Sequence, residues 1–424
     1  MIQNMLKFIE ESPTAFHAVA NIAESLKAHG YTQLKETECW SLEVGGKYYV
    51  IRNDSSIIAF CIPTETVKSF RVTAAHSDSP AFKLKEKPEI AMEDAYVKLN
   101  TEKYGGMILS TWLDRPLSVA GRVIIEENGQ LTTKLVNIEK DLLIIPNVAI
   151  HMNRDMNKGV EYNPQTDMLP LYSNIAGKDS FADLVAQNAG VKKEEILGSD
   201  LFVYNRAEGR LIGADEEFIC APRLDDLQCV YTALQGFLNA HKAGIVREGI
   251  MPVYAVFDNE EVGSGTKQGA DSTFLSDVLE RVCELLKMNQ EQYQQVLAGS
   301  FLLSADNAHA LHPNHPEKAD ITNRPVLNGG IVIKYHGSQK YTTDAYSAAF
   351  VTRICRRENL SYQTYANRSD IAGGSTLGNI STSHVSVPSA DIGIAQLAMH
   401  SAYETAGVQD TLDMIRFMSA YFRW

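Results

Sequence analysis

The sequence predicts an α/β protein in which a mixed, mostly parallel sheet is flanked by helices and an inserted β-rich domain interrupts the chain. Two observations predict this class. After about residue 211, apolar strand-like runs alternate with longer helical patterns, which is typical of a parallel sheet with helices on both faces. From about residue 86 to 210, short alternating segments indicate a unit of β-structure. We therefore expect a discontinuous larger domain, residues 1–88 and 211–424, and an inserted domain, residues 89–210.

The N-terminal region predicts helices followed by strands. Apolar residues recur at helical spacing near the start, and Pro13 restarts the chain into a second amphipathic segment that ends at Gly30. Residues 48–62 and 70–75 are rich in β-forming residues, so we expect strands there. Inside the inserted domain, Asn128-Gly129 stands between GRVIIEE and QLTTKLV, which favours a two-residue hairpin turn.

The C-terminal half carries the prediction of the parallel sheet. Three apolar strand-like runs each precede a segment with helical periodicity. The pairs are EFICAP before LQCVYTALQGFLNAHK, MPVYAVF before FLSDVLERVCELL, and GIVIKY before AYSAAFVTRICRREN.

Composition and charge exclude several classes of protein. The 424 residues carry 39 Lys and Arg against 52 Asp and Glu, a net charge of −13, so we expect neither nucleic acid nor an anionic membrane as a partner. No apolar run approaches ~18 residues, and the start lacks the basic and apolar segments of a signal peptide. The six cysteines are scattered, and we expect them to be reduced and buried. These features predict a soluble, cytoplasmic protein.

Acidic and imidazole side chains follow five of the strand-like runs. Open α/β sheets bind ligands at the carboxyl ends of their strands, so residues at these places are candidates for a site. Each one alone has an ordinary structural explanation, such as a helix cap or a solvated acid. Together they would repel one another unless a multivalent cation neutralised them. The segments are His76-Ser77-Asp78, Asp225-Asp226, Asp258-Asn259-Glu260-Glu261, Asp306-Asn307-Ala308-His309 and His400.

These residue types predict a metal centre for zinc, cobalt or manganese, because imidazole and carboxylate ligands suit all three ions. Asp78 can accept the second ring N–H of a metal-bound His76 and so hold its orientation. Of the neighbours Glu260 and Glu261, one can bind metal while the other stays free as a general acid or base. Two metal ions ~3.5–4 Å apart that share one carboxylate would suit hydrolysis through a bridging hydroxide.

At these residues the sequence resembles the aspartyl aminopeptidase family, two-zinc enzymes that assemble as tetrahedral dodecamers. The likeness runs in order from near residue 10 to the C-terminus. It departs from the family pattern at Asp226, where Asn is common, at Ala402-Tyr403, and at residues 370–374, where Asp-x-Pro-Cys-Gly is usual. The matching stretches are SPTAFHAVA, AAHSDSPAFKLK, TWLDRPLSVAGRV, IPNVAIHMNRDMN, APRLDDLQC, FDNEEVGS, SADNAHALHPNHPEK, IKYHGSQKYTT and QLAMHS.

The resemblance implies two bound metal ions and a proton shuttle. Glu260 would be the shuttle. The ligands would be His76 and Asp306 for one zinc, Glu261 and His400 for the other, and Asp225 as the bridge between them.

The resemblance also implies a substrate pocket that two subunits complete. His309 would face the substrate and stabilise the oxyanion, while Lys334 and Tyr341 would line the pocket. His151 of the inserted domain would reach the active site of a neighbouring subunit. The inserted domain would therefore both build a dimer, the basis of a homododecamer, and complete the site.

We therefore expect a metal-dependent aminopeptidase that releases residues one at a time from peptide N-termini, through a hydroxide held between two metal ions. A cation in the first pocket, for which Lys334 is the candidate, would add a preference for N-terminal Asp or Glu. One alternative is a dizinc amidase or deacylase of acylated amino acids, which would not require a free α-amine. The other is a non-catalytic scaffold of the same fold, which predicts the loss of a ligand, although every proposed position is occupied.

Overall fold

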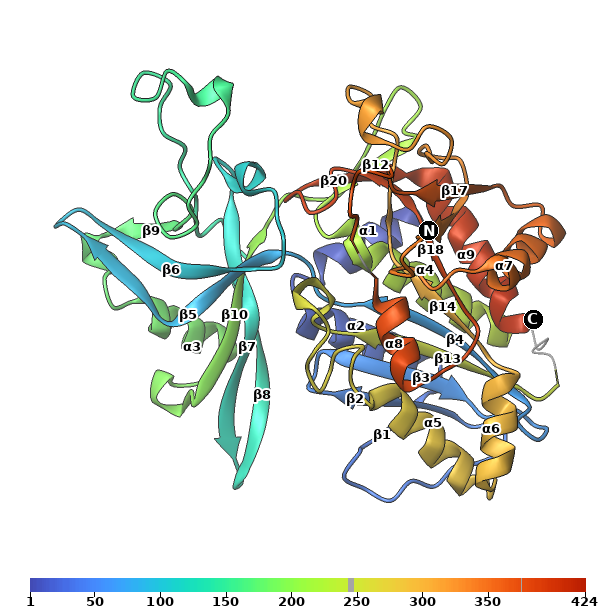
Figure 1. Cartoon of the computed structure of the whole chain (residues 1–424). Helices are drawn as coiled ribbons and strands as arrows, with labels where there is room; N and C mark the ends of the chain where they lie inside the picture. The colour runs from blue at the N-terminus through green and yellow to red at the C-terminus, as the bar shows by residue number, and fades with distance from the viewer. Residues whose placement is uncertain (243–247, 375) are drawn as a thin grey trace.

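The computed structural model describes residues 1–242, 248–374 and 376–424. They form two bodies that lie side by side (Figure 1). The larger body contains both ends of the chain, and the smaller one is built from a single internal stretch. This is the predicted arrangement of a larger domain interrupted by an insertion.

Within the described ranges, the larger body is built on a nine-stranded sheet, here the main sheet. Five of its eight strand pairings are parallel, which confirms the predicted mixed, mostly parallel sheet. Its central strands are apolar and buried on both faces, as covered parallel strands require. In spatial order the strands are β1 (Thr32–Leu34), β2 (Lys47–Arg52), β3 (Ser56–Cys61), β13 (Ile250–Phe257), β4 (Ser69–His76), β14 (Phe301–Ala305), β18 (Ser389–Gly393), β16 (Ile331–Tyr335) and β17 (Tyr362–Ala366).

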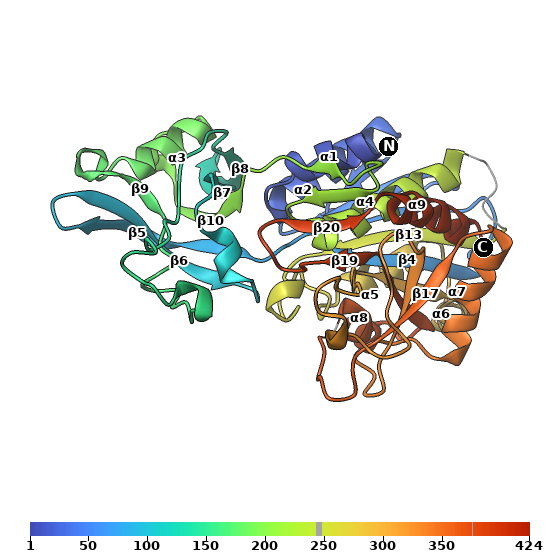
Figure 2. The ribbon, with the colours of Figure 1, turned by 90° about the horizontal axis from the view of Figure 1, so that it is seen from above.

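Helices cover both faces of the main sheet and close one apolar core on each (Figure 2). None of the described helices combines the length and the apolar character that a bilayer crossing requires. The first face carries α1 (Ile2–Glu10), α2 (Ala15–Ala28), α4 (Leu224–Lys242), α7 (Ala345–Arg357) and α9 (Val408–Arg423). The second carries α5 (Phe274–Leu285), α6 (Gln290–Ala298) and α8 (Leu377–His384).

The smaller body, as far as the structure describes it, is a six-stranded antiparallel sheet with its own apolar core, here the inserted sheet. The predicted hairpin is present, because Asn128 (φ 54°) and Gly129 (φ 76°) both adopt the left-handed conformation that a two-residue turn needs. The elements are β8 (Gln130–Asn137), β7 (Leu117–Glu127), β10 (Gly198–Asn205), β5 (Ala81–Met92), β6 (Tyr96–Tyr104) and β9 (Leu171–Asn174), with α3 (Phe181–Ala189) and the 3₁₀ turns η1 (Leu109–Trp112), η2 (Met156–Lys158), η3 (Ile175–Gly177) and η4 (Lys193–Glu195).

The first border of the inserted sheet lies earlier than a division between residues 88 and 89 would place it. Strand β5 begins at Ala81 and pairs with β6 on both sides of that point. A border at residue 88 would therefore cut a continuous strand, and the start of β5 is the better division.

One run expected in the main sheet, and part of a second, belong instead to a third sheet, here the small sheet, which has five strands among the described residues. Strand β12, which contains the EFICAP run, pairs with β11 and β20. The strand-like run that precedes His400, ADIGIAQLAM, divides into β18 of the main sheet and β19 of the small sheet. Apolar periodicity predicts a strand but does not tell which sheet a short run will join. The strands are β11 (Arg210–Ile212), β12 (Phe218–Ala221), β20 (Glu404–Gly407), β19 (Ala395–Leu397) and β15 (Ala308–His309).

Candidate metal centre

The centre gathers residues from the end of the main sheet and from the small sheet above it. His76 ends β4, Asp306 follows β14, and Glu260 and Glu261 form the 3₁₀ turn η5 (Glu260–Val262) after β13. These three strands are parallel neighbours, so their carboxyl ends meet at one edge, as predicted. Asp225 and His400 lie at the same edge but do not follow strands of the main sheet. Asp225 lies in the first turn of α4, and His400 follows β19 of the small sheet.

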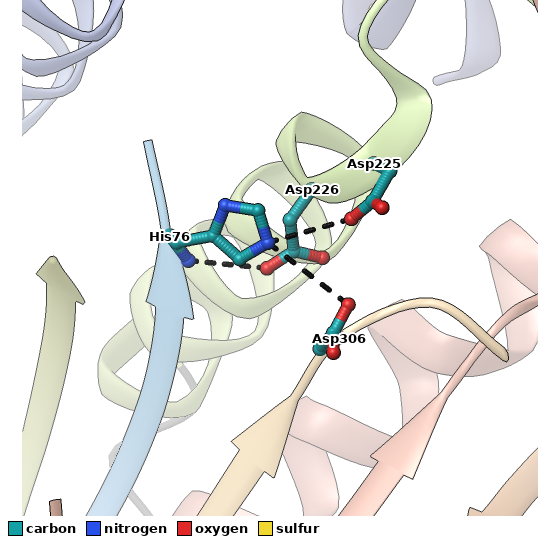
Figure 3. Close-up of side chains that lie close together, drawn as sticks. All are labelled: His76, Asp225, Asp226 and Asp306. Carbon is teal, nitrogen blue, oxygen red and sulfur yellow. Dashed lines mark hydrogen bonds and ion pairs between the residues drawn. The ribbon is translucent and has the colours of Figure 1, made fainter. Parts of the chain in front are cut away.

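One group of ligand atoms forms around His76 (Figure 3). His76 Nε2 lies 3.4 Å from Asp225 Oδ1 and 4.0 Å from Asp306 Oδ1. The main-chain N–H of His76 donates to Asp226 Oδ2 at 3.1 Å. All four residues are buried, and the ligand atoms they offer lie within 4.8 Å of one another.

A second group shares Asp225 with the first. His400 Nε2 lies 3.3 Å from Asp225 Oδ2 and 3.3 Å from Glu261 Oε1. The two oxygens of Asp225 therefore face different partners, Oδ1 toward His76 and Oδ2 toward His400. Glu260, with His76 and Glu261, forms a third close set.

Left-handed backbone at non-glycine residues marks the turns that carry the centre. Arg223 (φ 56°) precedes Asp225, Asn259 (φ 62°) precedes Glu260, and His400 itself has φ 65°. Non-glycine residues adopt this conformation at an energetic cost and gather at functional sites. The local chain is thus bent to present these side chains.

Glu404 holds two of the candidate ligand residues by their main chain. Its buried carboxylate accepts the N–H of Asp225 at 3.0 Å and the N–H of His400 at 2.8 Å. The sequence pattern assigns no role to Glu404 or to Asp226. The signal that could have found them is an additional acid near a candidate ligand in the sequence, since Asp226 directly follows Asp225 and Glu404 lies four residues after His400.

Asp78 lies beneath the centre, but its contact with His76 differs in detail from the expectation. His76 Nδ1 lies 3.1 Å from the main-chain carbonyl of Asp78 and 3.3 Å from its Oδ1. The carboxylate of Asp78 also accepts the N–H of Glu260 at 3.2 Å and that of Glu261 at 3.1 Å. Asp78 thus supports the imidazole and the neighbouring acidic turn together.

The two imidazoles are held in an acidic environment that shifts their pKa values upward. Burial would lower the pKa of His76, but the surrounding carboxylates, Asp226 first, raise it well above its ordinary range. Burial also opposes the charged form of His400, yet Asp225 and Glu261 raise its pKa to about 11. Burial would raise the pKa of Asp225, but the contacts with His400 and His76 hold it below its ordinary value.

The other acids of the centre are shifted upward. Burial raises the pKa of Glu260 to about 8 and that of Glu261 to about 7. Burial also raises the pKa of Asp226 and Asp306. Ionising all of these carboxyls in one buried place is unfavourable without a cation, and a divalent ion would reverse this balance.

The residues present fit a divalent metal. Three buried carboxylate oxygens, Asp225 Oδ1, Asp226 Oδ1 and Glu261 Oε1, accept no hydrogen bond of good geometry, although an imidazole nitrogen lies 3.4 Å from the first and 3.3 Å from the third. A buried acceptor left without a donor costs ~1–3 kcal/mol, and a cation supplies the missing partner. Imidazole nitrogens and carboxylate oxygens are also the ligands that zinc takes in hydrolases.

A cavity of about 290 Å³ opens onto these residues. His309, Lys334 and Tyr341 line it together with His76 and His400, so these three predicted substrate residues lie beside the candidate metal ligands. Burial and the charge of Lys334 lower the pKa of His309, which favours its neutral form.

His151 lies apart from this cavity within its own chain. It is exposed, on the segment of the inserted domain between β8 and β9. It belongs to none of the close groups of His, Asp and Glu found in the described part of the chain. The single chain therefore does not bring it to the centre.

Known proteins share this fold and sequence. Residues 8–422 match the family model described as "Aminopeptidase I zinc metalloprotease (M18)". The "Probable M18 family aminopeptidase 2" of Clostridium novyi is 47% identical over 414 residues, which cover 96% of this chain and 94% of that protein. The structure described as the "Ape4 and Nbr1 complex" is 34% identical, with a TM-score of 0.95 over 99% of this chain and 85% of that one. The "mApe1 dodecamer" of yeast is 28% identical, with a TM-score of 0.86 over 99% of this chain and 95% of that one.

Proposed function

The chain belongs to the M18 family of zinc metallo-aminopeptidases, and we propose that it removes the N-terminal residue of peptides at a centre of two divalent metal ions. The observation that carries the two-metal proposal is the position of Asp225. One of its oxygens faces His76 and the other faces His400, which is the arrangement expected of a carboxylate shared between two ions.

We assign the ligands from the two groups that share this residue. His76 and Asp306 would hold one ion. Glu261 and His400 would hold the other, and Asp225 would bridge them. Zinc is the ion that the family description names, and cobalt or manganese would suit the same ligands. When bound, such ions polarise a peptide carbonyl and lower the pKa of water toward neutrality.

Glu260 is the proposed proton shuttle. It lines the substrate cavity, and it is not needed to complete either proposed ligand set. Its carboxylate would accept a proton from the attacking water and deliver it to the leaving amine. Its main chain is fixed by Asp78, so the carboxyl group starts from a defined position.

His309 and the acidic wall of the cavity would orient the substrate. A free α-amine is cationic, so a cavity lined by Asp225, Glu260 and Asp306 favours the N-terminal end of a peptide. His309 would donate a hydrogen bond to the oxyanion that forms when water attacks the carbonyl. This placement distinguishes an aminopeptidase from an amidase of acylated amino acids, whose substrates carry no such charge.

We propose a preference for N-terminal Asp or Glu as a separate point. Its support is the buried positive charge of Lys334 on the cavity wall. The net charge of −13 gives no long-range attraction for acidic peptides, so any such preference has to arise locally.

The assembly is a further part of the proposal. The mApe1 structure above is described as a dodecamer, and we propose a dimer-based homododecamer for this chain. Exposed apolar side chains at Val148, Ile150 and Met152 flank His151 and suit a contact with another copy. In that contact, His151 would enter the substrate cavity of the neighbouring subunit.

We place the protein in the cytoplasm, acting on peptides and not on nucleic acid or membranes. All six cysteines are unpaired, as expected, which suits a reducing compartment. Cys39 is exposed and not buried, because it lies in the loop between β1 and β2.

The test compares arylamides of Asp, Glu, Leu and Ala, each with a free and an acetylated α-amine. We expect turnover of the free amines only, with loss of activity on chelation and recovery with zinc. Turnover of the acetylated forms would favour the amidase alternative, and equal or faster turnover of Leu than of Asp would overturn the acidic preference. A protein that binds metal but cleaves none of the arylamides would favour the scaffold.

A further inference from the structure

Tyr104 is a residue of the inserted domain whose ring packs within that domain and whose hydroxyl contacts residues beside the candidate metal centre. It is the last residue of β6, and its ring packs edge-on against Phe202, with centroids 5.4 Å apart. Its hydroxyl donates to Asp78 Oδ2 at 2.7 Å and accepts from Asn259 Nδ2 at 2.8 Å. One side chain of the inserted domain is therefore bound to two residues that surround the acidic turn.

Asp78 links Tyr104 to the two glutamates through hydrogen bonds to their main chain. Its carboxylate accepts the N–H of Glu260 through Oδ1 and the N–H of Glu261 through Oδ2. The Tyr104 hydroxyl donates to the same Oδ2 that receives Glu261. Asp78 is buried, so water cannot replace the Tyr104 hydroxyl if it is lost. The carboxylate would then be held less firmly and could turn away from the two N–H groups.

Asn259 holds Tyr104 from the other side. Its side-chain carbonyl accepts the Thr266 hydroxyl at 2.7 Å and the Gln268 amide at 2.8 Å. These two donors fix which end of the Asn259 amide faces Tyr104, so the N–H₂ group is presented to the phenol oxygen. The phenol proton is then directed to Asp78.

The residues after Tyr104 contact the remaining ligand-bearing turns. Gly105 (φ +80°) adopts a backbone conformation that other residues rarely take, and a Cβ there would lie only 3.1 Å from Cβ of Glu261, so that side chain would have to shift. The carbonyl of Gly106 accepts a hydrogen bond from His400 Nδ1, and the N–H of Ile108 donates to the His400 carbonyl at 3.0 Å. The inserted domain thus touches the centre of its own chain at both Glu261 and His400.

From these contacts we propose that Tyr104 is a positioning residue for Glu260 and Glu261, acting through Asp78, so that the inserted domain sets the geometry of the metal centre within its own chain. The proposal rests on the proposed function, in which Glu260 is the proton shuttle and Glu261 a metal ligand. Tyr104 lines a separate cavity of about 370 Å³ between the two domains and not the substrate cavity. It therefore acts on the reaction through the turn that it holds.

The test is Tyr104→Phe, which removes the hydroxyl and keeps the ring. Tyr172→Phe is the matched control, because the Tyr172 hydroxyl bonds Ser180 at 2.8 Å and its ring packs edge-on against Phe181, 5.6 Å away, all within the inserted domain. We measure zinc affinity of the metal-free proteins by equilibrium dialysis, then kcat and KM on an aminoacyl arylamide at saturating zinc, and the melting temperature.

Loss of an outer hydrogen-bond partner of a metal site typically lowers metal affinity or activity by about 10- to 100-fold. We therefore expect Tyr104→Phe to bind zinc about 10-fold more weakly and to lower kcat about 10-fold, with KM unchanged. Tyr172→Phe should match the wild type. If Tyr104→Phe keeps wild-type zinc affinity and kcat, or changes only the melting temperature as a structural residue would, the proposal is wrong.

Asp78→Ala supplies the second comparison. In that background the Tyr104→Phe change should have no further effect on zinc affinity, because the route through Asp78 is already lost. Two independent, additive losses would overturn the route. A wild-type protein that cleaves no arylamide would refute the proposed function, whereas weaker zinc binding by Tyr104→Phe alone would still support the positioning role.

Discussion

Lys334 Nζ donates to Asp306 Oδ2 at 3.1 Å, and it also contacts the main-chain carbonyls of Asp306 at 2.9 Å and Asn307 at 3.2 Å. An ammonium group has three N–H donors, so these acceptors use all of them. Lys334 is 1% exposed and holds a proposed metal ligand in place. It can act on an acidic substrate through its charge but has no donor left for a direct hydrogen bond.

Lys334→Gln should therefore lower turnover of every substrate and not only of acidic ones. The change leaves Asp306 without its cation, so we expect weaker zinc binding and a fall in kcat/KM on all four arylamides by about 10-fold or more, with the larger fall on the Asp and Glu substrates that lose the charge of Lys334 as well. Lys340→Gln is the control, because Lys340 contacts only the Gly373 carbonyl, at 3.4 Å, among the hydrogen bonds described. A loss confined to Asp- and Glu-arylamides would mean that Lys334 binds the substrate directly.

Glu260 and Glu261 are adjacent, but Glu260→Gln should impair proton transfer whereas Glu261→Gln should impair metal binding. Glu260→Gln removes the proposed proton acceptor, so kcat should fall by about 10²–10⁴-fold while metal content is unchanged. Glu261→Gln removes a proposed ligand, so its main effect should be loss of metal. Metal analysis of the two purified proteins beside their kcat values checks this. Near wild-type turnover in Glu260→Gln would remove that residue from the reaction.

Metal stoichiometry tests the shared position of Asp225. Its two oxygens face the two imidazoles, so Asp225→Asn should weaken both sites together. His400→Ala should weaken only one, which leaves the pair of His76 and Asp306 with its metal. We expect two equivalents of zinc in the wild type, one in His400→Ala and fewer than one in Asp225→Asn. One equivalent in the wild type would contradict the bridged pair.

His17 gives the protein a pH-dependent stability that is separate from the metal centre. Burial, assisted by Arg223, lowers its pKa from 6.5 to about 4, and its Nδ1 lies 2.8 Å from the Thr14 hydroxyl. The unfolded chain takes up the proton near pH 6.5 and the folded one only near pH 4. This contribution is therefore complete above pH 6.5 and is lost as the pH falls toward 4, by at most about 3 kcal/mol.

His17→Gln should remove that dependence. The free energy of unfolding of the metal-free protein, measured in urea at pH 8 and pH 5, should fall less in the variant than in the wild type. His29→Gln, at the end of the same helix, serves as the comparison. Identical pH dependence in wild type and His17→Gln would show that this histidine is not the source.

The sequence predicted the parallel strand ends well because the physical rule is simple. Strands β4, β13 and β14 run parallel, so their carboxyl ends share one edge of the sheet, and His76, Glu260 and Asp306 lie there. The family resemblance is also confirmed, since residues 8–422 match the M18 family model. Asp225 is a different case: it was predicted because it follows the EFICAP run, but that run forms β12 of the small sheet and not a strand of the main sheet.

The long-range contacts that support the candidate centre were not predicted from the sequence. Glu404 accepts the N–H of Asp225, although the two residues are 179 positions apart in the chain. The Tyr104 hydroxyl donates to Asp78 although the two residues belong to different domains. Neither contact can be deduced from periodicity or spacing, because both depend on how the small sheet and the inserted domain fold back over the main sheet. From the sequence alone, an acid such as Glu404 would be expected on the surface, and a tyrosine such as Tyr104 would be expected to serve in packing.

The order of the proposed ligands along the chain also has a consequence for protein synthesis. His76 lies on an early strand and His400 shortly before α9, so a ribosome must make nearly the whole polypeptide before Asp225 meets its second imidazole. A nascent chain that has folded β4 and α4 holds only His76 and Asp225 of the five proposed ligands.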